Sequence, residues 1–84
     1  MKIKVEKKSN NRPTETDSYV GSRIRDRRIM MGLSQQDIAD LIGVTYQQAH
    51  KYERGINRIS ASRLYDIARV LQVKVRYFFD EIEN

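Results

Sequence analysis

The sequence of 84 residues predicts a compact all-α fold of five helices. Glycines recur at Gly32, Gly43 and Gly55, where a helix can end in the left-handed conformation, and the single proline, Pro13, precedes them. Between these glycines lie segments of helical length in which large apolar residues are spaced three or four apart. Helices separated by short turns therefore account for the chain beyond its first residues.

The first helix is predicted to begin near Asp17 or Ser18, either of which can cap it, and to run to Met31. A spacing of four along one face predicts its inward-facing residues, which are Val20, Ile24 and Arg28.

Residues 1–15 differ in composition and are predicted to form a flexible basic N-terminal arm. They contain five Lys or Arg, polar side chains and few large apolar groups. The folded domain is expected over residues 16–80, followed by an acidic C-terminal end at residues 81–84. We expect the arm to be solvated or, alternatively, to add attraction to a polyanion.

Two short helices joined by a tight turn are predicted at the centre of the chain. Ser34 is expected to cap the first, residues 35–42, whose buried stripe is Ile38, Ala39 and Ile42. Gly43 permits a sharp left-handed turn, Val44 fills the corner, and Thr45 caps the next helix. This layout is that of a helix-turn-helix.

Ser60 is predicted to cap a fourth helix, whose buried face is Leu64, Ile67, Ala68 and Leu71. The segment VKVRYFF at residues 73–79 alternates as a strand does, but the sequence offers no second strand to pair with it. We therefore predict a short final helix that carries Phe78 and Phe79.

Composition argues against several classes of protein. The chain has no cysteine and one histidine, His50, so neither disulfides nor a metal site are expected. No apolar run approaches the ~18 residues of a membrane span, and the polar N-terminus does not resemble a signal peptide. The sequence shows neither a nucleophile with a partnered base nor a glycine-rich phosphate loop. It therefore gives no indication of an enzyme. We expect a cytoplasmic protein without catalytic residues, cofactor or small-molecule ligand.

The net charge of +5 is unevenly distributed along the chain. Residues 1–58 carry twelve basic and seven acidic side chains, whereas residues 59–84 carry four of each. The excess of positive charge over the first two thirds favours a polyanionic partner such as nucleic acid. A basic protein that is merely soluble is the alternative.

The helix after Thr45 has one face without a carboxylate. At about 100° per residue, its inner side holds Thr45, Ala49, Tyr52 and Glu53. Its outer side holds Tyr46, Gln47, His50, Lys51 and Arg54. Amide, ammonium and aromatic groups suit the base edges of duplex DNA. The candidate base-reading residues are Tyr46, Gln47 and Lys51, with Gln48 at the margin of the face, and His50 is expected to be solvated or to face a phosphate.

The stretch LSQQDIADLIGVTYQQAHKYERG at residues 33–55, followed by LYDIARVLQV at 64–73, resembles the XRE family of phage repressor and Cro-like transcriptional regulators. The likeness covers residues 20–79, and the residues that match in register include Leu33, Gln35, Ala39, Gly43, Val44, Glu53 and Gly55. It implies a five-helix, lambda-repressor-like domain that binds DNA as a dimer. Ala49 and Tyr52 depart from the aliphatic residues that the family more often has.

The resemblance also assigns roles outside the reading positions. Gln35 falls on a phosphate-clasping glutamine, Thr45 on a phosphate-contacting cap, and Asn57 and Arg58 on a backbone clamp. With the two outer-face residues that suit phosphates, the predicted phosphate contacts are Gln35, Thr45, His50, Arg54, Asn57 and Arg58. The resemblance also implies a structural ion pair between Arg28 and Glu53. Apart from the resemblance, we expect a homodimer contact at Val75, Phe79 and Ile82.

The function that the sequence predicts is sequence-specific regulation of transcription by a homodimer on a palindromic double-stranded DNA site. The alternative is an antitoxin-like or co-regulator module that uses the same fold to hold a protein partner. Phe79 and Ile82, beside acidic residues, suit either a partner or a homodimer. A small helical bundle with a solvated polar face is the remaining interpretation.

Overall fold

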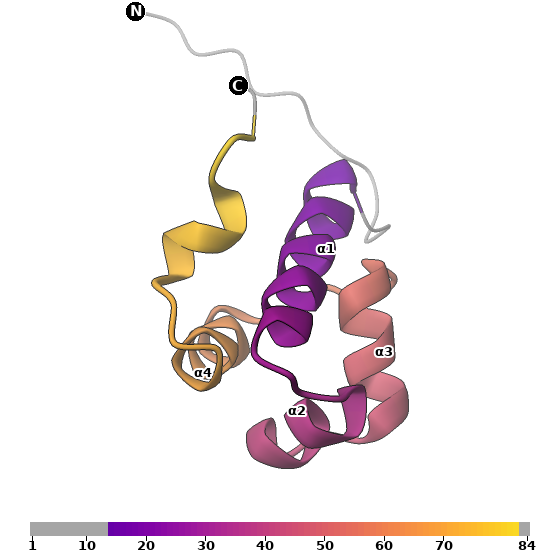
Figure 1. The fold of residues 1–84 in the computed structure, drawn as a ribbon. Coiled ribbons are helices and arrows are strands. Elements are labelled where there is room, and N and C mark those ends of the chain that lie inside the picture. The colour runs from indigo at the N-terminus through magenta and orange to yellow at the C-terminus, as the bar shows by residue number, and fades with distance from the viewer. Residues whose placement is uncertain (1–13, 83–84) are drawn as a thin grey trace, which may run out of the picture.

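The computed structural model describes residues 14–82, which form four α-helices and a short 3₁₀-helix without any strand (Figure 1). The elements are α1 (Glu15–Met30), α2 (Gln35–Ile42), α3 (Tyr46–Arg54), α4 (Ala61–Val70) and η1 (Val75–Phe79). The all-α prediction is confirmed, but the fifth helix is a 3₁₀-helix, so the number of α-helices is four. Within residues 14–82, none of the helices is long and apolar enough to span a membrane. Residues 1–13 of the predicted arm (1–15) and residues 83–84 of the predicted acidic end (81–84) lie outside the described residues, whereas Glu15 of the predicted arm is the first residue of α1.

Helix α1 begins earlier than the sequence predicted, and Asp17 plays a different part in capping it. Thr14 is the N-cap: its hydroxyl oxygen accepts from the Asp17 backbone N–H at 3.3 Å. The Asp17 carboxylate in turn accepts from the Thr14 backbone N–H at 2.7 Å. The prediction that α1 begins near Asp17 or Ser18 is therefore wrong. Asp17 lies inside the first turn, where its side chain completes the capping box. The helix ends at Met30, with Met31 as its C-cap.

The helix-turn-helix has the predicted bounds and caps. Ser34 and Asp37 form a second capping box, with the Asp37 N–H donating to the Ser34 hydroxyl at 2.9 Å and the Ser34 N–H donating to the Asp37 carboxylate at 2.8 Å. Donation from the Ser34 backbone and hydroxyl lowers the pKa of Asp37 below its ordinary value of 3.8. Gly43 ends α2 with a φ of 74°, a conformation that glycine adopts without steric cost.

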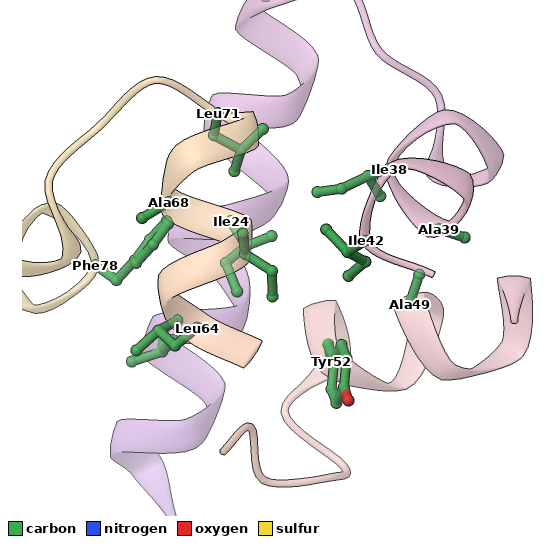
Figure 2. Packing of buried hydrophobic residues seen from close by; sticks show 12 residues of the cluster. Ile24, Ile38, Ala39, Ile42, Ala49, Tyr52, Leu64, Ala68, Leu71 and Phe78 are labelled. Atoms are coloured by element: carbon green, nitrogen blue, oxygen red, sulfur yellow. The ribbon is translucent and has the colours of Figure 1, made fainter. Parts of the chain in front are cut away.

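The core lies where α1, α2, α3, α4 and η1 converge (Figure 2). Side chains that were predicted to face inward on α1, α2 and α4 are all buried, and all of them except Arg28 belong to this core. Figure 2 shows Ala49 pointing from α3 toward α2, and Phe78 reaching from η1 toward Ala68 of α4. Ala49 and Tyr52, which depart from the family pattern, are 2% and 9% exposed. A small and a large side chain thus share the inner face of α3.

Helices α1 and α3 approach each other closely at Gly21, a glycine in the interior of α1. A Cβ atom at this position would lie 2.5 Å from the Tyr52 carbonyl oxygen and 2.6 Å from that of Glu53. Such distances are well inside van der Waals contact, and the obstructing atoms belong to the backbone. The absence of a side chain at Gly21 therefore sets how closely the last turn of α3 packs on α1.

The segment after α4 returns along another side of α1 (Figure 1). Three α1 side chains spaced four apart donate hydrogen bonds to backbone carbonyls of this segment. Tyr19 donates to the carbonyl of Asp80, Arg23 to that of Tyr77, and Arg27 to that of Leu71. We call the hydrogen bonds of these three side chains the carbonyl seam. Together with buried Phe78, it attaches the C-terminal segment to the domain.

Candidate nucleic-acid interface

Helix α3 is divided into a buried side and an exposed side. The buried residues are Ala49, Tyr52 and Glu53. The exposed residues are Tyr46, Gln47, Lys51 and Arg54, and the half-buried ones are Gln48 and His50. No carboxylate lies on the exposed side, because Glu53, the acidic residue of this helix, points inward and is 5% exposed. The structure therefore places the predicted base-reading residues on one accessible face.

The N-terminus of α3 adjoins this face. Thr45 is exposed, and its hydroxyl oxygen accepts from the Gln48 backbone N–H at 3.1 Å. Capping uses a lone pair of the hydroxyl and leaves its hydrogen available for an outside acceptor. The partial positive charge at a helix N-terminus favours an anion at this point. A phosphate beside Thr45 would meet both features.

The orientation of α3 is fixed by a buried ion pair with α1. Arg28 donates from Nε to Glu53 Oε2 at 2.7 Å and from Nη2 to Oε1 at 3.1 Å. The two side chains are 11% and 2% exposed. Arg28 also donates from Nη1 to the Leu33 carbonyl at 2.8 Å. One guanidinium thus joins the end of α1, the loop before α2 and the last turn of α3 through a bidentate contact and a third bond.

Gln35 links this ion pair to the exposed side of α3. Its amide nitrogen donates to Glu53 Oε1 at 3.0 Å, and its amide oxygen lies 3.3 Å from His50 Nδ1. The His50 ring is also stacked against Tyr46, with ring centroids 6.4 Å apart and an interplanar angle of 15°. The sequence predicts Gln35 and His50 as separate phosphate contacts and gives no indication of the hydrogen bond between them. Their separation of fifteen residues along the chain carries no signal of it.

The loop after α3 lies beside the start of α1. Arg58 is exposed, and its Nε lies 3.4 Å from Asp17 Oδ2. Asn57 is half-buried and lines a small hollow with Asp17 and Phe79. Asp17 therefore contributes both to the cap of α1 and to the position of the loop, a second role that the sequence analysis missed.

The three predicted dimer residues differ in exposure. Val75 is half-buried and packs against the protein's own core, and Ile82 is also half-buried. Phe79 is 41% exposed and offers the largest free apolar surface of the three. Among residues 14–82, no group of three His, Asp or Glu side chains is arranged to hold a metal ion.

Residues 24–78 match the helix-turn-helix family HTH_3. The chain belongs to this family. A transcriptional regulator in the ATPase CF(0) region of Rhodospirillum rubrum is 57% identical over 68 residues, which are 81% of this chain and 63% of that protein. The resemblance to XRE-type regulators is thus confirmed, and the chain spans less than two thirds of the length of this relative.

Solved structures of the family superpose on this fold. The restriction-modification controller protein C.AhdI from Aeromonas hydrophila has a TM-score of 0.74 at 29% identity, over 79% of this chain and all of that one. The biofilm master regulator SinR, solved in complex with DNA, has a TM-score of 0.67 at 29% identity, over 73% of this chain and 98% of that one. The helix-turn-helix of this chain therefore has a DNA-binding fold of transcriptional regulators.

Proposed function

We propose that this protein regulates transcription by binding a specific double-stranded DNA site with α3 in the major groove. The observation that carries the proposal is the exposed side of α3, where amide, phenol and cationic groups gather without a carboxylate. Its buried side is held rigidly by the Arg28–Glu53 pair. A helix presented in this way matches how a recognition helix meets base edges.

The residues proposed to read bases are Tyr46, Gln47, Gln48 and Lys51. Gln pairs with adenine through two hydrogen bonds, Lys donates to guanine, and an aromatic edge can contact the thymine methyl group. Because Gln47 and Lys51 are exposed and four residues apart, they lie one above the other on α3. They can therefore address neighbouring base pairs.

The residues proposed to contact phosphates surround the reading positions. They are Gln35, Thr45, His50, Arg54, Asn57 and Arg58. These positions come from the start of α2, both ends of α3 and the following loop, so they can hold the backbone on both sides of the groove. Phosphate contacts fix the register of a protein on DNA without selecting a sequence.

We further propose that two copies bind a palindromic site, with their α3 helices in successive major grooves about 34 Å apart. One small domain contacts few base pairs, and pairing two domains raises affinity without new contacts within each. Phe79 is the proposed centre of the dimer contact, with Val75 and Ile82 beside it. We propose a cytoplasmic protein that works without catalysis, cofactor or membrane.

The test is fluorescence anisotropy on a fragment from upstream of the gene and on a scrambled fragment of equal length, at two salt concentrations. We expect tight binding to the native fragment that persists at higher salt, because base contacts add to the salt-sensitive phosphate term. Equal binding to both fragments that vanishes with salt would contradict sequence-specific recognition.

Matched variants separate the two classes of contact. Gln47→Ala or Lys51→Ala should weaken the native site by about 1–3 kcal/mol and change the scrambled duplex little. Arg58→Ala should weaken both and reduce the salt slope by about one. If Gln47→Ala weakened all sequences equally, its role as a base reader would be wrong.

Sedimentation of the protein with its DNA tests the dimer. We expect two protomers on the palindrome, and one protomer on a half-site or with Phe79→Asp. One protomer on the full site at micromolar concentration would contradict the dimer.

A second function, as an antitoxin-like or co-regulator module, is favoured by the exposed ring of Phe79 next to Asp80 and Glu81. The same surface that suits a second copy suits an unlike chain. Co-purification from the native cell distinguishes them: a stoichiometric partner protein supports this second function, whereas the protein purified alone supports a stand-alone regulator.

A further inference from the structure

The contact between Gln35 and His50 restricts where the imidazole carries its proton. Both carboxylate oxygens of Glu53 accept hydrogen bonds from Arg28, so Glu53 presents only hydrogen-bond acceptors to Gln35. Gln35 must therefore turn its amide NH₂ toward Glu53, at 3.0 Å, and its carbonyl oxygen toward His50. A carbonyl oxygen can only accept, and His50 Nδ1 lies 3.3 Å from it. The proton of a neutral His50 ring accordingly belongs on Nδ1.

We infer that Gln35 is a positioning residue that fixes His50 in the Nδ1–H form, so that His50 contacts DNA phosphate only as an imidazolium and binding takes up a proton. This inference rests on the proposed function, in which His50 faces a phosphate. With Nδ1 donating to Gln35, Nε2 of the neutral ring is an acceptor and would repel a phosphate oxygen. Protonation converts Nε2 into a donor, and the ring then offers a charge-assisted bond.

Charged groups around the ring act in both directions. Beyond Gln35, Glu53 of α3 favours the imidazolium, and Arg28 of α1 neutralises that carboxylate. On α3 itself, Lys51 and Arg54 oppose another positive charge, and the Tyr46 ring stacks against the imidazole. Bound DNA adds a phosphate to the charged groups around His50. The negative charge of this phosphate favours the protonated ring.

The sign of the effect follows from linkage. A bound state that holds more protons than the free state is favoured at low pH, so affinity falls as pH rises through the range where histidines ordinarily titrate. Each protomer contributes at most one proton, which corresponds to a slope of up to about tenfold per pH unit for each protomer bound. His50 is the single histidine of the chain, which makes both of its ring nitrogens observable without overlap.

The first test needs no DNA. In protein labelled with ¹⁵N at histidine, above the histidine titration range, we expect ring shifts of the Nδ1–H tautomer. Gln35→Leu should move them toward the Nε2–H tautomer that an unconstrained imidazole prefers. The neighbouring Gln36 is exposed and donates to Asp40 Oδ1 at 2.9 Å, so Gln36→Leu is the matched control and should leave the tautomer unchanged. An Nε2–H tautomer in the unaltered protein would overturn the inference.

The second test uses a duplex that the protein enriches from a random-sequence pool, titrated between about pH 5.5 and 8. We expect affinity to fall with rising pH for the unaltered protein, a flat profile for His50→Gln, and a shallower slope for Gln35→Leu, whose neutral ring can donate from Nε2. A flat or opposite profile for the unaltered protein on an enriched duplex overturns proton uptake and leaves the proposed function standing. If no duplex is enriched, the proposed function fails and proton uptake falls with it.

Discussion

Helix α1 is attached to its neighbours by different chemistry on two of its sides. Toward α3 it places Arg28 against the side chain of Glu53, and it brings Gly21 against backbone. Toward the C-terminal segment, the carbonyl seam joins Tyr19, Arg23 and Arg27 to main-chain oxygens. The Arg28–Glu53 contact depends on the identity of both residues. Each contact of the carbonyl seam depends on the identity of the donor residue alone and on the course of the segment that supplies the carbonyl.

The two sides also differ in what remains when a contact is lost. Removing Arg28 leaves Glu53 charged in a site where its side chain is 2% exposed. Removing a seam donor leaves a backbone carbonyl in a partly buried or exposed contact, where water can take the place of the donor. Sensitivity to substitution should therefore be much greater on the side that orients α3.

The largest expected effect is that of Arg28→Met. It should lower the free energy of unfolding by about 3–5 kcal/mol, because it leaves a buried carboxylate without its cation. Urea denaturation followed by circular dichroism measures this change. The double variant Arg28→Met/Glu53→Leu is the control and should be more stable than Arg28→Met alone. A single-variant cost below that of an ordinary surface pair, about 1 kcal/mol, would contradict the role given to the pair.

Gly21→Ala should be next in size, with a loss of about 1–3 kcal/mol, because the new methyl group meets the carbonyls of Tyr52 and Glu53. This direction opposes helix propensity, which favours alanine over glycine inside a helix by about 1 kcal/mol. Thermal unfolding provides the measurement. Ser22→Ala, one residue further along α1 and exposed, is the control and should stay within about 0.5 kcal/mol. A stabilised Gly21→Ala would show that the two helices can separate freely.

The same contrast explains what could be predicted from the sequence. Periodicity, caps and glycine turns predicted α2, α3 and the buried residues, because each is a local pattern. The Arg28–Glu53 pair was accessible through the family resemblance, since both partners are side chains at characteristic positions. The carbonyl seam was not, because its acceptors are backbone atoms present at every residue. The Gly21 contact and the Gln35–His50 bond likewise depend on how distant segments meet.

Within the seam, Arg23→Met should have the largest effect, a loss of about 1–2 kcal/mol. Arg23 donates from Nε and Nη2 to the Tyr77 carbonyl at 3.1 and 3.0 Å, and its guanidinium carbon lies 4.0 Å from the centre of the Tyr77 ring. Methionine retains an apolar stem and loses both the hydrogen bonds and the cation–π contact. Urea denaturation gives the cost, and Arg25→Met, at an exposed position of α1, is the matched control. A cost as large as that of Arg28→Met would contradict the difference between the two sides.

The smallest expected effects are those of two variants at one contact of the carbonyl seam. They test whether the identity of the residue that supplies the carbonyl matters. Tyr19→Phe removes the hydroxyl that donates to the Asp80 carbonyl and should cost about 0.5–1.5 kcal/mol. Asp80→Ala changes the residue on the other side of the same bond but keeps its carbonyl, so it should cost less than Tyr19→Phe. On the α3 side the corresponding pair of variants, Arg28→Met and Glu53→Leu, should both be costly, because each leaves a buried group without its partner. Equal costs for Tyr19→Phe and Asp80→Ala would mean that the Asp80 side chain, rather than the course of the chain, holds the C-terminal segment in place.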